Sequence, residues 1–463
     1  MTQGPKDGGG ADRRKRLVAD LRASRKPARR TDTPERPVTS GPAATARAFD
    51  FSQLPAFRQL GMHRAAAEMI GLDNPFFRPH DGVAGATTTM DGTQADNFAS
   101  YNYLGLNGHP EVNAAVTRAV AQYGTSASAS RVVAGERPIH RELEARLAAV
   151  HGTEDAVVMV SGHATNVTTI GHLMAGEDLI LSDSLVHNSI SEGARLSGAA
   201  RMNFPHGDLD TLEALLAEHR HKFNHVLIAV EGIYSMDGDF PDLKRLIALK
   251  STFDAWLMVD EAHSVGVLGA TGRGIAEHFG IDARGVEMWM GTLSKTFSSC
   301  GGYIAGSKAL CDYLRATAPG FVFSVGLSPA LAAAAIASIE LMEREPDRVR
   351  RLAENGRRFL TAARAAGLDT GPSAGLSVVP VIVGDSIAAA TLSNRLLARG
   401  INALPIVFPA VAEKSARLRF FITSDHSAEQ IDRAVAATAE ELARLREQNT
   451  GFGTLVARAR QMG

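Results

Sequence analysis

Short apolar runs alternate with amphipathic stretches through the middle of the chain. Each run is six to eight residues long, and we expect a strand at each of them: 155–162, 178–183, 225–232, 255–262, 286–292 and 302–307. Fully apolar strands separated by helices are typical of a parallel sheet that is covered on both faces. Between the runs, segments such as 208–223 have helical spacing of apolar residues. The pattern therefore predicts an α/β fold with a mainly parallel central sheet and helices on both faces.

The pattern changes towards both ends of the chain. Residues 1–47 are rich in Gly, Pro, Arg and Thr without apolar periodicity, and we expect a mostly disordered arm there. Residues 48–97 contain short amphipathic pieces and predict a lead-in segment. The remainder predicts a large domain over 98–345 and a smaller α+β domain over 346–463. The smaller domain has strand patterns and a helix pattern at 377–383, 417–423 and 428–448.

Length and composition narrow the class of protein. A chain of 463 residues, 45% of them hydrophobic, can bury the cores of about two or three domains. It has no run of about 18 apolar residues, so we expect no membrane span. The first residues do not have a secretory signal pattern. Two cysteines, Cys300 and Cys311, cannot build a disulfide scaffold or a cysteine zinc cluster, so we expect a cytoplasmic protein without a metal site.

The net charge of −1 conceals an uneven distribution of charge. Residues 1–47 contain 12 Lys and Arg but 5 Asp and Glu, while the rest contains 37 and 45. The basic arm is either a solvated tail or a docking arm for an acidic partner such as a carrier protein or a nucleic acid. Only nine of the 49 basic residues are lysines, with none between Lys26 and Lys222. A lysine in an apolar or small-residue context therefore stands out.

Candidate chemistry follows the predicted strands at their carboxyl ends, where open α/β sheets bind ligands. Asp260 ends one run; its carboxylate can keep a heterocyclic nitrogen protonated, or it can simply cap the next helix. Lys295 follows the run 286–292 among small and hydroxyl residues. If partly buried, it has a lowered pKa and can bind an aldehyde as a Schiff base; the alternative is an ordinary loop lysine.

Three other strand ends bear polar groups. The turn at Ser161 and Gly162 precedes a helical pattern, and its backbone amides suit a phosphate. His187 follows the strand 178–183, although a lone histidine is more often structural than catalytic, and Glu231 and Ser235 follow the next strand. A phosphate cradle, an acid for a ring nitrogen, a flat histidine and a lysine 35 residues after the acid together match what pyridoxal 5'-phosphate requires.

A series of motifs from about Phe98 to Val435 indicates a family. The motifs are NYLGL (102–106), GERPIHRELE (135–144), SGHATN (161–166), HNS (187–189), EGIYSMDGD (231–239), DEAHSVGVLG (260–269), GTLSK (291–295) and ARLRFF (416–421). In this order and spacing the sequence resembles the α-oxoamine synthases, pyridoxal-phosphate-dependent acyltransferases of fold type I. Members of that family include 8-amino-7-oxononanoate synthase and serine palmitoyltransferase.

The resemblance implies roles around the cofactor. Lys295 would bind it as a Schiff base and act as a base, and Asp260 would face the ring nitrogen. His263 would hydrogen-bond the phenolic oxygen, and His187 would stack on the ring. The remaining cofactor contacts that the resemblance implies, near the phosphate or behind the direct contacts, are Ser161, Gly162, His163, Glu231, Ser235, Thr292 and Ser324.

The resemblance also implies substrates and partners. Asn102 would contact the substrate, and Arg419 would hold the amino-acid carboxylate; no other arginine precedes it within 403–416. The reaction would join glycine, alanine or serine, with serine the best guess, to an acyl thioester of coenzyme A or acyl carrier protein. It would yield an α-amino ketone, carbon dioxide and free thiol. Ser324 would reach the phosphate of a neighbouring subunit, which implies a homodimer with shared active sites.

Two alternatives use the same residues differently. A fold-type-I aminotransferase would use Lys295 and Asp260 but form a 2-oxo acid instead of releasing a thiol. A non-catalytic partner subunit or a cofactor-binding regulator is the other alternative. Such regulators usually have an N-terminal winged-helix domain, which residues 1–97 do not convincingly show. We therefore expect an enzyme without a nucleic-acid partner.

Overall fold

The computed structural model describes residues 50–69 and 71–448. The arm predicted over 1–47 lies outside these residues. The chain divides into two units, 1–66 and 67–463, and every residue of the site described below belongs to the second.

The described part of the first unit is helical. Asp50 caps the 3-10 helix Phe51–Gln53, because its carboxylate accepts a hydrogen bond from the Ser52 backbone N–H at 2.9 Å. Helix α2 (Pro55–Met69) follows and extends past the division between the units.

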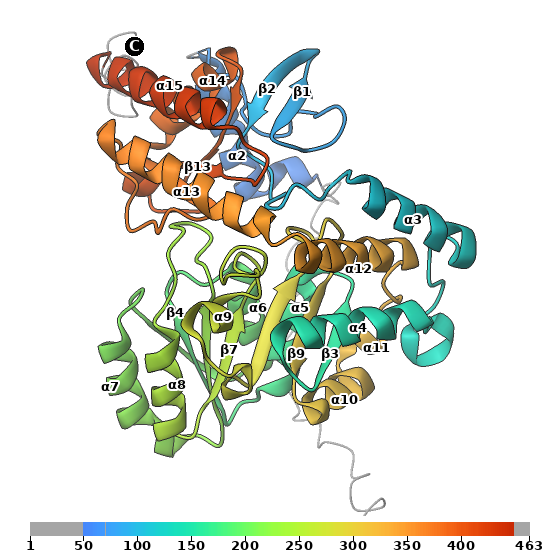
Figure 1. Ribbon diagram of the computed structural model, residues 1–463. Coiled ribbons are helices and arrows are strands. Elements are labelled where there is room, and N and C mark those ends of the chain that lie inside the picture. Colours follow the sequence, from blue (N-terminus) through green and yellow to red (C-terminus); the bar gives the residue numbers. More distant parts are fainter. Residues whose placement is uncertain (1–49, 70, 449–463) are drawn as a thin grey trace, which may run out of the picture. The chain divides into compact units, whose positions relative to one another are not determined.

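A seven-stranded sheet forms the centre of the second unit (Figure 1). Its strands are β3 (Asp155–Met159), β4 (Leu179–Asp183), β5 (Ala200–Phe204), β6 (Val226–Glu231), β7 (Trp256–Asp260), β8 (Met288–Thr292) and β9 (Gly302–Gly306). The order across the sheet is β3-β9-β8-β7-β6-β4-β5, and β4 to β8 pair in parallel. The predicted fold class, α/β with a mainly parallel central sheet, is confirmed.

Two strands differ from the sequence expectation. β9 runs antiparallel to both of its neighbours, β3 and β8. It follows β8 after a short connection through Lys295 rather than after a crossover helix, so it returns in the opposite direction. β5 lies at the edge of the sheet, where half-buried and exposed residues alternate before the buried Phe204. It therefore has no continuous apolar run to reveal it.

Helices cover the two faces of the sheet because successive strand residues point to opposite sides. In β6, Val226, Ile228 and Val230 belong to one buried cluster, which includes side chains of α4, α7, α8 and α12. Leu227 and Ala229 belong to a second cluster, with side chains of α5, α6 and α10. The helices of this region are α3 (Pro110–Tyr123), α4 (Pro138–His151), α5 (Gly162–Leu173), α6 (Asn188–Ser197), α7 (Leu209–His219), α8 (Leu243–Thr252), α9 (Ile275–Phe279), α10 (Lys308–Thr317), α11 (Pro319–Val322) and α12 (Pro329–Arg344).

The C-terminal region is α+β, as its pattern predicts. Its elements are α13 (Asp347–Ala365), β10 (Val378–Gly384), α14 (Ser386–Ala398), β11 (Ile401–Asn402), β12 (Leu404–Ile406), β13 (Ala416–Phe421) and α15 (Ala428–Glu447). β13 pairs antiparallel with β10 and β12. In Figure 1 these helices, in orange and red, gather beside β1 and β2.

The lead-in segment contributes strands to this region. β1 (Thr87–Met90) and β2 (Thr93–Asn97) form a hairpin, and β11 adds to β2 in parallel. Arg433 on α15 forms an ion pair with Asp96 of β2. The hairpin thus pairs through Asp96 and Asn97 with the chain at 401–402. The domain boundaries predicted from the sequence stay a prediction.

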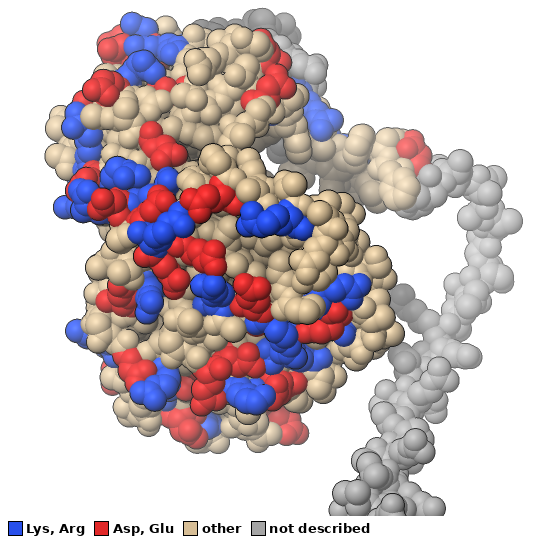
Figure 2. Space-filling view, turned by 45° about the vertical axis from the view of Figure 1, so that its right-hand side comes forward, with Lys and Arg blue, Asp and Glu red and all other residues tan. Residues whose placement is uncertain are grey.

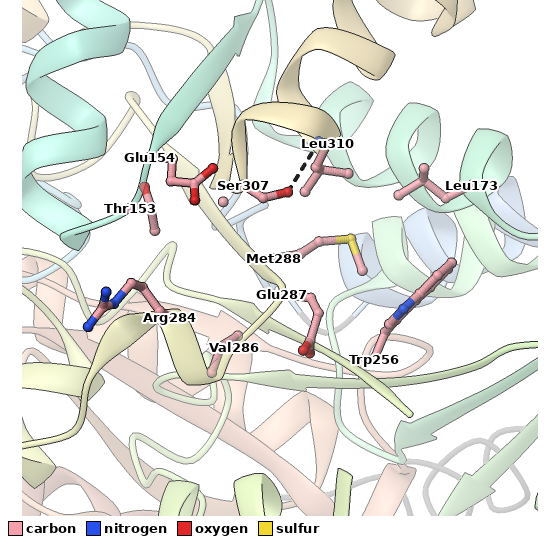
Figure 3. Close-up of a pocket in the computed structure, with 11 residues that line it drawn as sticks. Thr153, Glu154, Leu173, Trp256, Arg284, Val286, Glu287, Met288, Ser307 and Leu310 are labelled. Atoms are coloured by element: carbon pink, nitrogen blue, oxygen red, sulfur yellow. Dashed lines mark hydrogen bonds between the residues drawn. The ribbon is translucent and has the colours of Figure 1, made fainter. Parts of the chain in front are cut away.

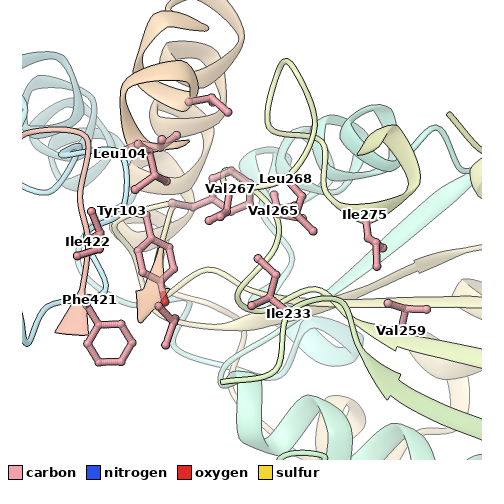
Figure 4. Packing of buried hydrophobic residues seen from close by; sticks show 14 of the residues in the cluster. Tyr103, Leu104, Ile233, Val259, Val265, Val267, Leu268, Ile275, Phe421 and Ile422 are labelled. Atoms are coloured by element: carbon pink, nitrogen blue, oxygen red, sulfur yellow. The ribbon is translucent and has the colours of Figure 1, made fainter. Parts of the chain in front are cut away.

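A buried junction connects the C-terminal region to the strand-end loops of the central sheet. Figure 4 shows Tyr103 and Leu104 between Phe421 and Ile422 on one side and the segment 265–268 on the other. The backbone N–H of Ser424 donates to the Tyr103 carbonyl at 2.8 Å. This packing holds the segment NYLGL beside the loops that bear the candidate chemistry.

Among the described residues, no helix is both long and apolar enough to cross a bilayer.

Candidate active site

The parallel strands bring the predicted residues to one edge of the sheet. Glu231 at the end of β6 is in register with Asp260 at the end of β7, and Thr292 ends the neighbouring strand β8. Asp183 ends β4, and His187 follows it directly before α6. Strand direction alone therefore gathers these side chains, as the sequence predicts.

Asp260 is the centre of a buried hydrogen-bond chain. Its side chain accepts from the backbone N–H of Ala262 at 3.0 Å and from Nδ2 of Asn166 at 2.8 Å. Asn166 also donates to the hydroxyl of Ser189 at 2.9 Å, and this hydroxyl lies 2.7 Å from Nδ1 of His187. The two predicted residues Asp260 and His187 are thus connected through two that the sequence reasoning missed. Their signal was available, since both are buried polar residues within the quoted motifs SGHATN and HNS.

His187 and Lys295 both have lowered pKa values. Burial lowers the pKa of His187, and the positive Lys295 lowers it further against the opposing effect of Asp260. Burial lowers the pKa of the half-buried Lys295 to about 8, while Asp260 and Glu231 counteract part of that shift. The site therefore holds a neutral imidazole and a lysine with a sizeable free-amine fraction near neutral pH, which is the nucleophilic form.

His263 is held in one tautomer by a tyrosine. Its Nδ1 lies 2.7 Å from the hydroxyl of Tyr103, and both side chains are buried. Burial raises the pKa of Tyr103 and lowers that of His263 well below its ordinary value. The tyrosine hydroxyl is therefore the donor and Nδ1 the acceptor, which leaves the proton on Nε2. Tyr103 was not predicted as a site residue, although it lies in the motif NYLGL.

Glu231, a second carboxyl group beside Asp260, has a raised pKa. It is 2% exposed, and one oxygen accepts from the backbone N–H of Ser235 at 3.2 Å. The other oxygen has no hydrogen-bond partner among the described residues. Burial, reinforced by the nearby Asp260, raises the pKa of Glu231 to about 8. Near neutral pH Glu231 is mostly protonated.

Close backbone approaches shape the anion cradle at the start of α5. Ser161 caps this helix by accepting from the Ala164 N–H at 3.3 Å. A Cβ on Gly162 would lie 2.8 Å from the Thr292 hydroxyl, and one on Gly302 would lie 2.7 Å from the Gly162 Cα. Only glycines allow β8, β9 and the helix N-terminus to meet here, and such a terminus favours an anion. His163, on the first turn, is exposed, with its ring centroid 6.3 Å from that of His187.

The two arginines of β13 have different surroundings. Arg417 is buried, and its charge is compensated by an ion pair with Asp237. Arg419 donates to the Ser235 carbonyl at 3.0 Å, and its guanidinium lies 4.6 Å from the centroid of the Phe421 ring. Its buried Nε has no partner in the described part of the chain. Arg419 is therefore the arginine with donor capacity left for a carboxylate, as the sequence reasoning expects.

A cavity of about 370 Å³ adjoins Lys295. It is lined by His80, Ala84, Asn97, Ala99, Ser100, Tyr101, Asn102, Asn107, Ser294, Lys295, Ser298 and Ser299. Asn102 lies here as expected, although its amide already donates to the Ala84 carbonyl at 3.1 Å and accepts from the Asn107 N–H at 3.1 Å. Its contact with a substrate stays a prediction. Ser324 is not among the lining residues; it lies in the turn after α11, between the exposed Phe323 and Val325.

Another cavity, of about 420 Å³, opens at the opposite edge of the sheet, beside the start of β7 and β8 (Figure 3). Its carboxylates are already bonded within the fold. Glu287 accepts from the Leu257 N–H at 2.8 Å and pairs with Lys250, and Glu154 accepts from the Lys308 N–H at 2.8 Å. The shifted pKa values of Lys295, His187 and Glu231 belong to the other edge, beside the Lys295 cavity. The unpaired buried atoms of Glu231 and Arg419 lie there as well.

Comparison with known proteins agrees with this geometry. The family described as aminotransferase class I and II matches residues 95–437. The 8-amino-7-oxononanoate synthase of Symbiobacterium thermophilum is 39% identical over 392 residues, which cover 85% of this chain and 97% of the relative. The 8-amino-7-oxononanoate synthase 1 of Bacillus subtilis is 39% identical over 365 residues, 78% of this chain and 92% of the relative.

A solved structure of Sphingomonas wittichii serine palmitoyltransferase superposes with a TM-score of 0.81 at 29% identity, covering 85% of this chain and 98% of the other. Fold and site thus define a pyridoxal-phosphate-dependent transferase of fold type I. Within that class, the chain belongs to the α-oxoamine synthase family, whose members are acyltransferases. The resemblance drawn from the motifs is confirmed.

Proposed function

We propose that this enzyme condenses a small L-amino acid with an acyl thioester of coenzyme A or an acyl carrier protein, with loss of carbon dioxide and thiol. The observation that carries the proposal is the grouping at one sheet edge of buried Asp260, a lysine of lowered pKa and an arginine with an unpaired donor. An aminotransferase can use all three, because its substrate is also an amino acid with a carboxylate, so the products decide between the reactions.

The residues at this edge fit pyridoxal 5'-phosphate. Asp260 would face the ring nitrogen, His187 would lie against the ring, and Nε2 of His263 would donate to the phenolic oxygen. The α5 N-terminus at Gly162, with Thr292, would receive the phosphate. When bound, the cofactor supplies an aldehyde for an amine and a cationic ring that withdraws electrons from the substrate Cα.

Lys295 has two tasks in this proposal. Its free amine would hold the aldehyde of the cofactor in the resting enzyme, and the same amine, when free beside a bound amino acid, would accept the substrate Cα proton. A pKa of about 8 suits both tasks, because the amine is then neutral often enough to act and basic enough to hold a proton. The mostly protonated Glu231 leaves Asp260 as the carboxylate that stabilises a cationic ring.

Arg419 would orient the amino-acid carboxylate. Its guanidinium is fixed by the Ser235 carbonyl and by the Phe421 ring, so the remaining donors point from a rigid base. A carboxylate bound there is held while the Cα proton leaves. The same carboxylate is lost as carbon dioxide only after the acyl group has joined Cα, because the β-keto group then accepts the electron pair of the breaking bond.

Serine is the first candidate for the amino acid. The cavity beside Lys295 is lined mainly by hydroxyl and amide side chains, which can hydrogen-bond a substrate hydroxyl. Alanine is the second candidate, supported by the curated relatives. The product named 8-amino-7-oxononanoate is an α-amino ketone whose terminal carbon 9 has no oxygen, as a condensation with alanine would give.

The experiment is a product assay with the purified holoenzyme, each of glycine, alanine and serine in turn, and an acyl-coenzyme A. We expect equal amounts of thiol and carbon dioxide with one amino acid, at a kcat/KM at least about tenfold above the other two. Formation of a 2-oxo acid without thiol release would show an aminotransferase instead.

A homodimer is the proposed assembly. Val133 is 82% exposed and Phe323 is 84% exposed. Their segments are bonded together, since the Ser130 hydroxyl donates to the Val322 carbonyl at 2.6 Å and the Gly326 N–H donates to the Ala129 carbonyl at 2.9 Å. Exposed apolar groups on adjoining segments mark contact surfaces, and Ser324 lies among them. A second copy on this surface would bring Ser324 to its phosphate.

The proposed location is the cytoplasm. The two cysteines are free thiols, with Cys311 buried and Cys300 exposed, and an exposed free thiol suits a reducing compartment. On the face shown in Figure 2, basic and acidic side chains of the described residues are intermixed.

A further inference from the structure

The loop 232–239, between β6 and α8, is the anchor for both arginines of β13. Arg419 donates to the Ser235 carbonyl at 3.0 Å, and Arg417 donates to the Met236 carbonyl at 3.1 Å. Arg417 is also paired with Asp237. The place of the Arg419 guanidinium therefore depends on where this loop lies.

Hydrogen bonds within the loop close it into a turn. The Tyr234 N–H donates to the Asp239 carbonyl at 2.9 Å, and the Gly238 N–H donates to the Tyr234 carbonyl at 2.8 Å. A Cβ on Gly238 would lie 2.0 Å from the Val378 carbonyl, so the turn also presses against β10. Whatever fixes Asp239 thereby fixes Ser235.

His206 bridges two carboxylates at this point. Its Nδ1 lies 3.0 Å from an oxygen of Asp183, and its Nε2 lies 2.9 Å from Oδ2 of Asp239. Its ring meets the Tyr234 ring edge-on, with 4.4 Å between centroids. An imidazole can donate from both nitrogens at once only in its cationic form. The cationic His206 thus connects the end of β4, through Asp183, to the loop 232–239, through Asp239.

Asp183 is held rigidly on its side of the bridge. Its side chain is 1% exposed and accepts from the backbone N–H groups of Leu185 at 2.8 Å and Gly207 at 2.9 Å. Burial by itself lowers the pKa of His206, but the bonds to Asp183 and Asp239 outweigh it and raise the pKa to about 10. At neutral pH, His206 is therefore cationic and hydrogen-bonded to both Asp183 and Asp239.

We propose that His206 is a positioning residue for the amino-acid substrate, because its bridge between Asp183 and Asp239 holds the loop on which Arg419 is anchored. The inference rests on the proposed role of Arg419 as the carboxylate-binding residue. His206 touches neither the substrate nor the cofactor in this account. It acts through Asp239, the turn and the Ser235 carbonyl.

The test compares His206→Gln with His225→Gln in the holoenzyme. His225 is a matched control, because its Nδ1 also lies 3.0 Å from an aspartate, Asp178, and its ring stacks on Trp256, but it precedes β6 at the opposite edge of the sheet. The readouts are the dissociation constant of the amino acid by calorimetry and the KM of the acyl thioester.

We expect His206→Gln to raise the dissociation constant of the amino acid on the order of tenfold, with the acyl-thioester KM unchanged. His225→Gln should stay within about twofold of wild type. Asp239→Asn, which keeps the His206–Asp183 contact, should shift the amino-acid constant in the same direction by less, and it serves if His206→Gln fails to fold.

Arg419→Ala is measured in parallel to separate the two claims. If Arg419→Ala weakens amino-acid binding and His206→Gln does not, the role of His206 is refuted while that of Arg419 stands. If Arg419→Ala leaves binding unchanged, both are overturned. Equal shifts in the His206 and His225 variants would indicate a general structural effect and refute the positioning role.

Discussion

At the scale of single residues, neighbouring groups decide which role each side chain of the site can have. Asp260 and Glu231 are carboxyl groups at adjacent strand ends, yet Asp260 has two hydrogen-bond donors and Glu231 one. Arg417 and Arg419 are two residues apart on β13, yet Asp237 pairs with the first. Two carboxyl groups and two arginines of the site can therefore have different roles, because each has different hydrogen-bond and ion-pair partners.

Arg419 gives the first prediction at this scale. Arg419→Ala should raise the amino-acid KM roughly 10- to 150-fold, since a hydrogen bond to a charged group is worth about 1.5–3 kcal/mol. Arg419→Lys keeps the charge but loses the planar fork, so it should recover part of the loss. Steady-state kinetics at a saturating acyl thioester give both values. An unchanged KM in Arg419→Ala would move carboxylate binding elsewhere.

Lys295 gives a pH prediction. Its free amine is the form that attacks the aldehyde, and its pKa of about 8 is below the ordinary lysine value. The rate at which apoenzyme binds pyridoxal 5'-phosphate covalently should rise about tenfold between pH values of about 7 and 9, then level off. Stopped-flow absorbance measures this rate. A rate that continues to rise towards a pH of about 10.5 would indicate an ordinary exposed lysine.

At the scale of elements, apolar runs and strand ends are sufficient to predict the sheet edge and most of the site. Asp260, Lys295 and His187 were found because each follows a continuous apolar run. The strand at β9 was predicted but its reversed direction was not, and the edge strand β5 was not predicted, since direction and edge position depend on pairing between distant segments. Tyr103 and His206 were missed because their partners lie far away in sequence. Asn166 and Ser189 lie within quoted motifs, but the hydrogen bonds that connect them to Asp260 and His187 depend on the fold.

The meeting of α5 with β8 and β9 gives a prediction about elements. Gly302→Ala places a Cβ 2.7 Å from the Gly162 backbone, which cannot move without shifting the N-terminus of α5. We expect a loss of about 1–3 kcal/mol of stability and a weaker affinity for the cofactor. Thermal unfolding and a cofactor titration measure the two effects.

Gly176→Ala is the control for this substitution. A Cβ there has as its nearest neighbour the Gly198 carbonyl at 4.0 Å, so both quantities should stay near wild type. If Gly302→Ala binds the cofactor as tightly as wild type, the close approach is not what shapes the phosphate site.

At the scale of the whole molecule, the proposed function includes a second copy of the chain. Ser324 is not among the residues lining the Lys295 cavity, although the family resemblance assigns it to a phosphate. The exposed Val133 and Phe323 adjoin it on bonded segments. A symmetric dimer through this surface would explain both observations at once.

Phe323→Glu tests this assembly. A charge in place of a central aromatic contact should weaken the dimer by at least about 2 kcal/mol, or roughly 30-fold in its dissociation constant, and activity should fall with it. Light scattering after size exclusion measures the mass. Leu196→Glu, at a position 67% exposed on α6, should leave the mass unchanged. A wild-type enzyme that is active as a monomer would contradict the proposal.

The central claim is that Lys295 is the residue to which the cofactor is bound. Reduction of the holoenzyme with borohydride fixes the link between aldehyde and amine, and mass spectrometry of the peptides then identifies the labelled lysine among the nine in the chain. We predict a phosphopyridoxyl group on Lys295 and none in the Lys295→Ala variant. A label on another lysine, with Lys295 unmodified, would contradict the account.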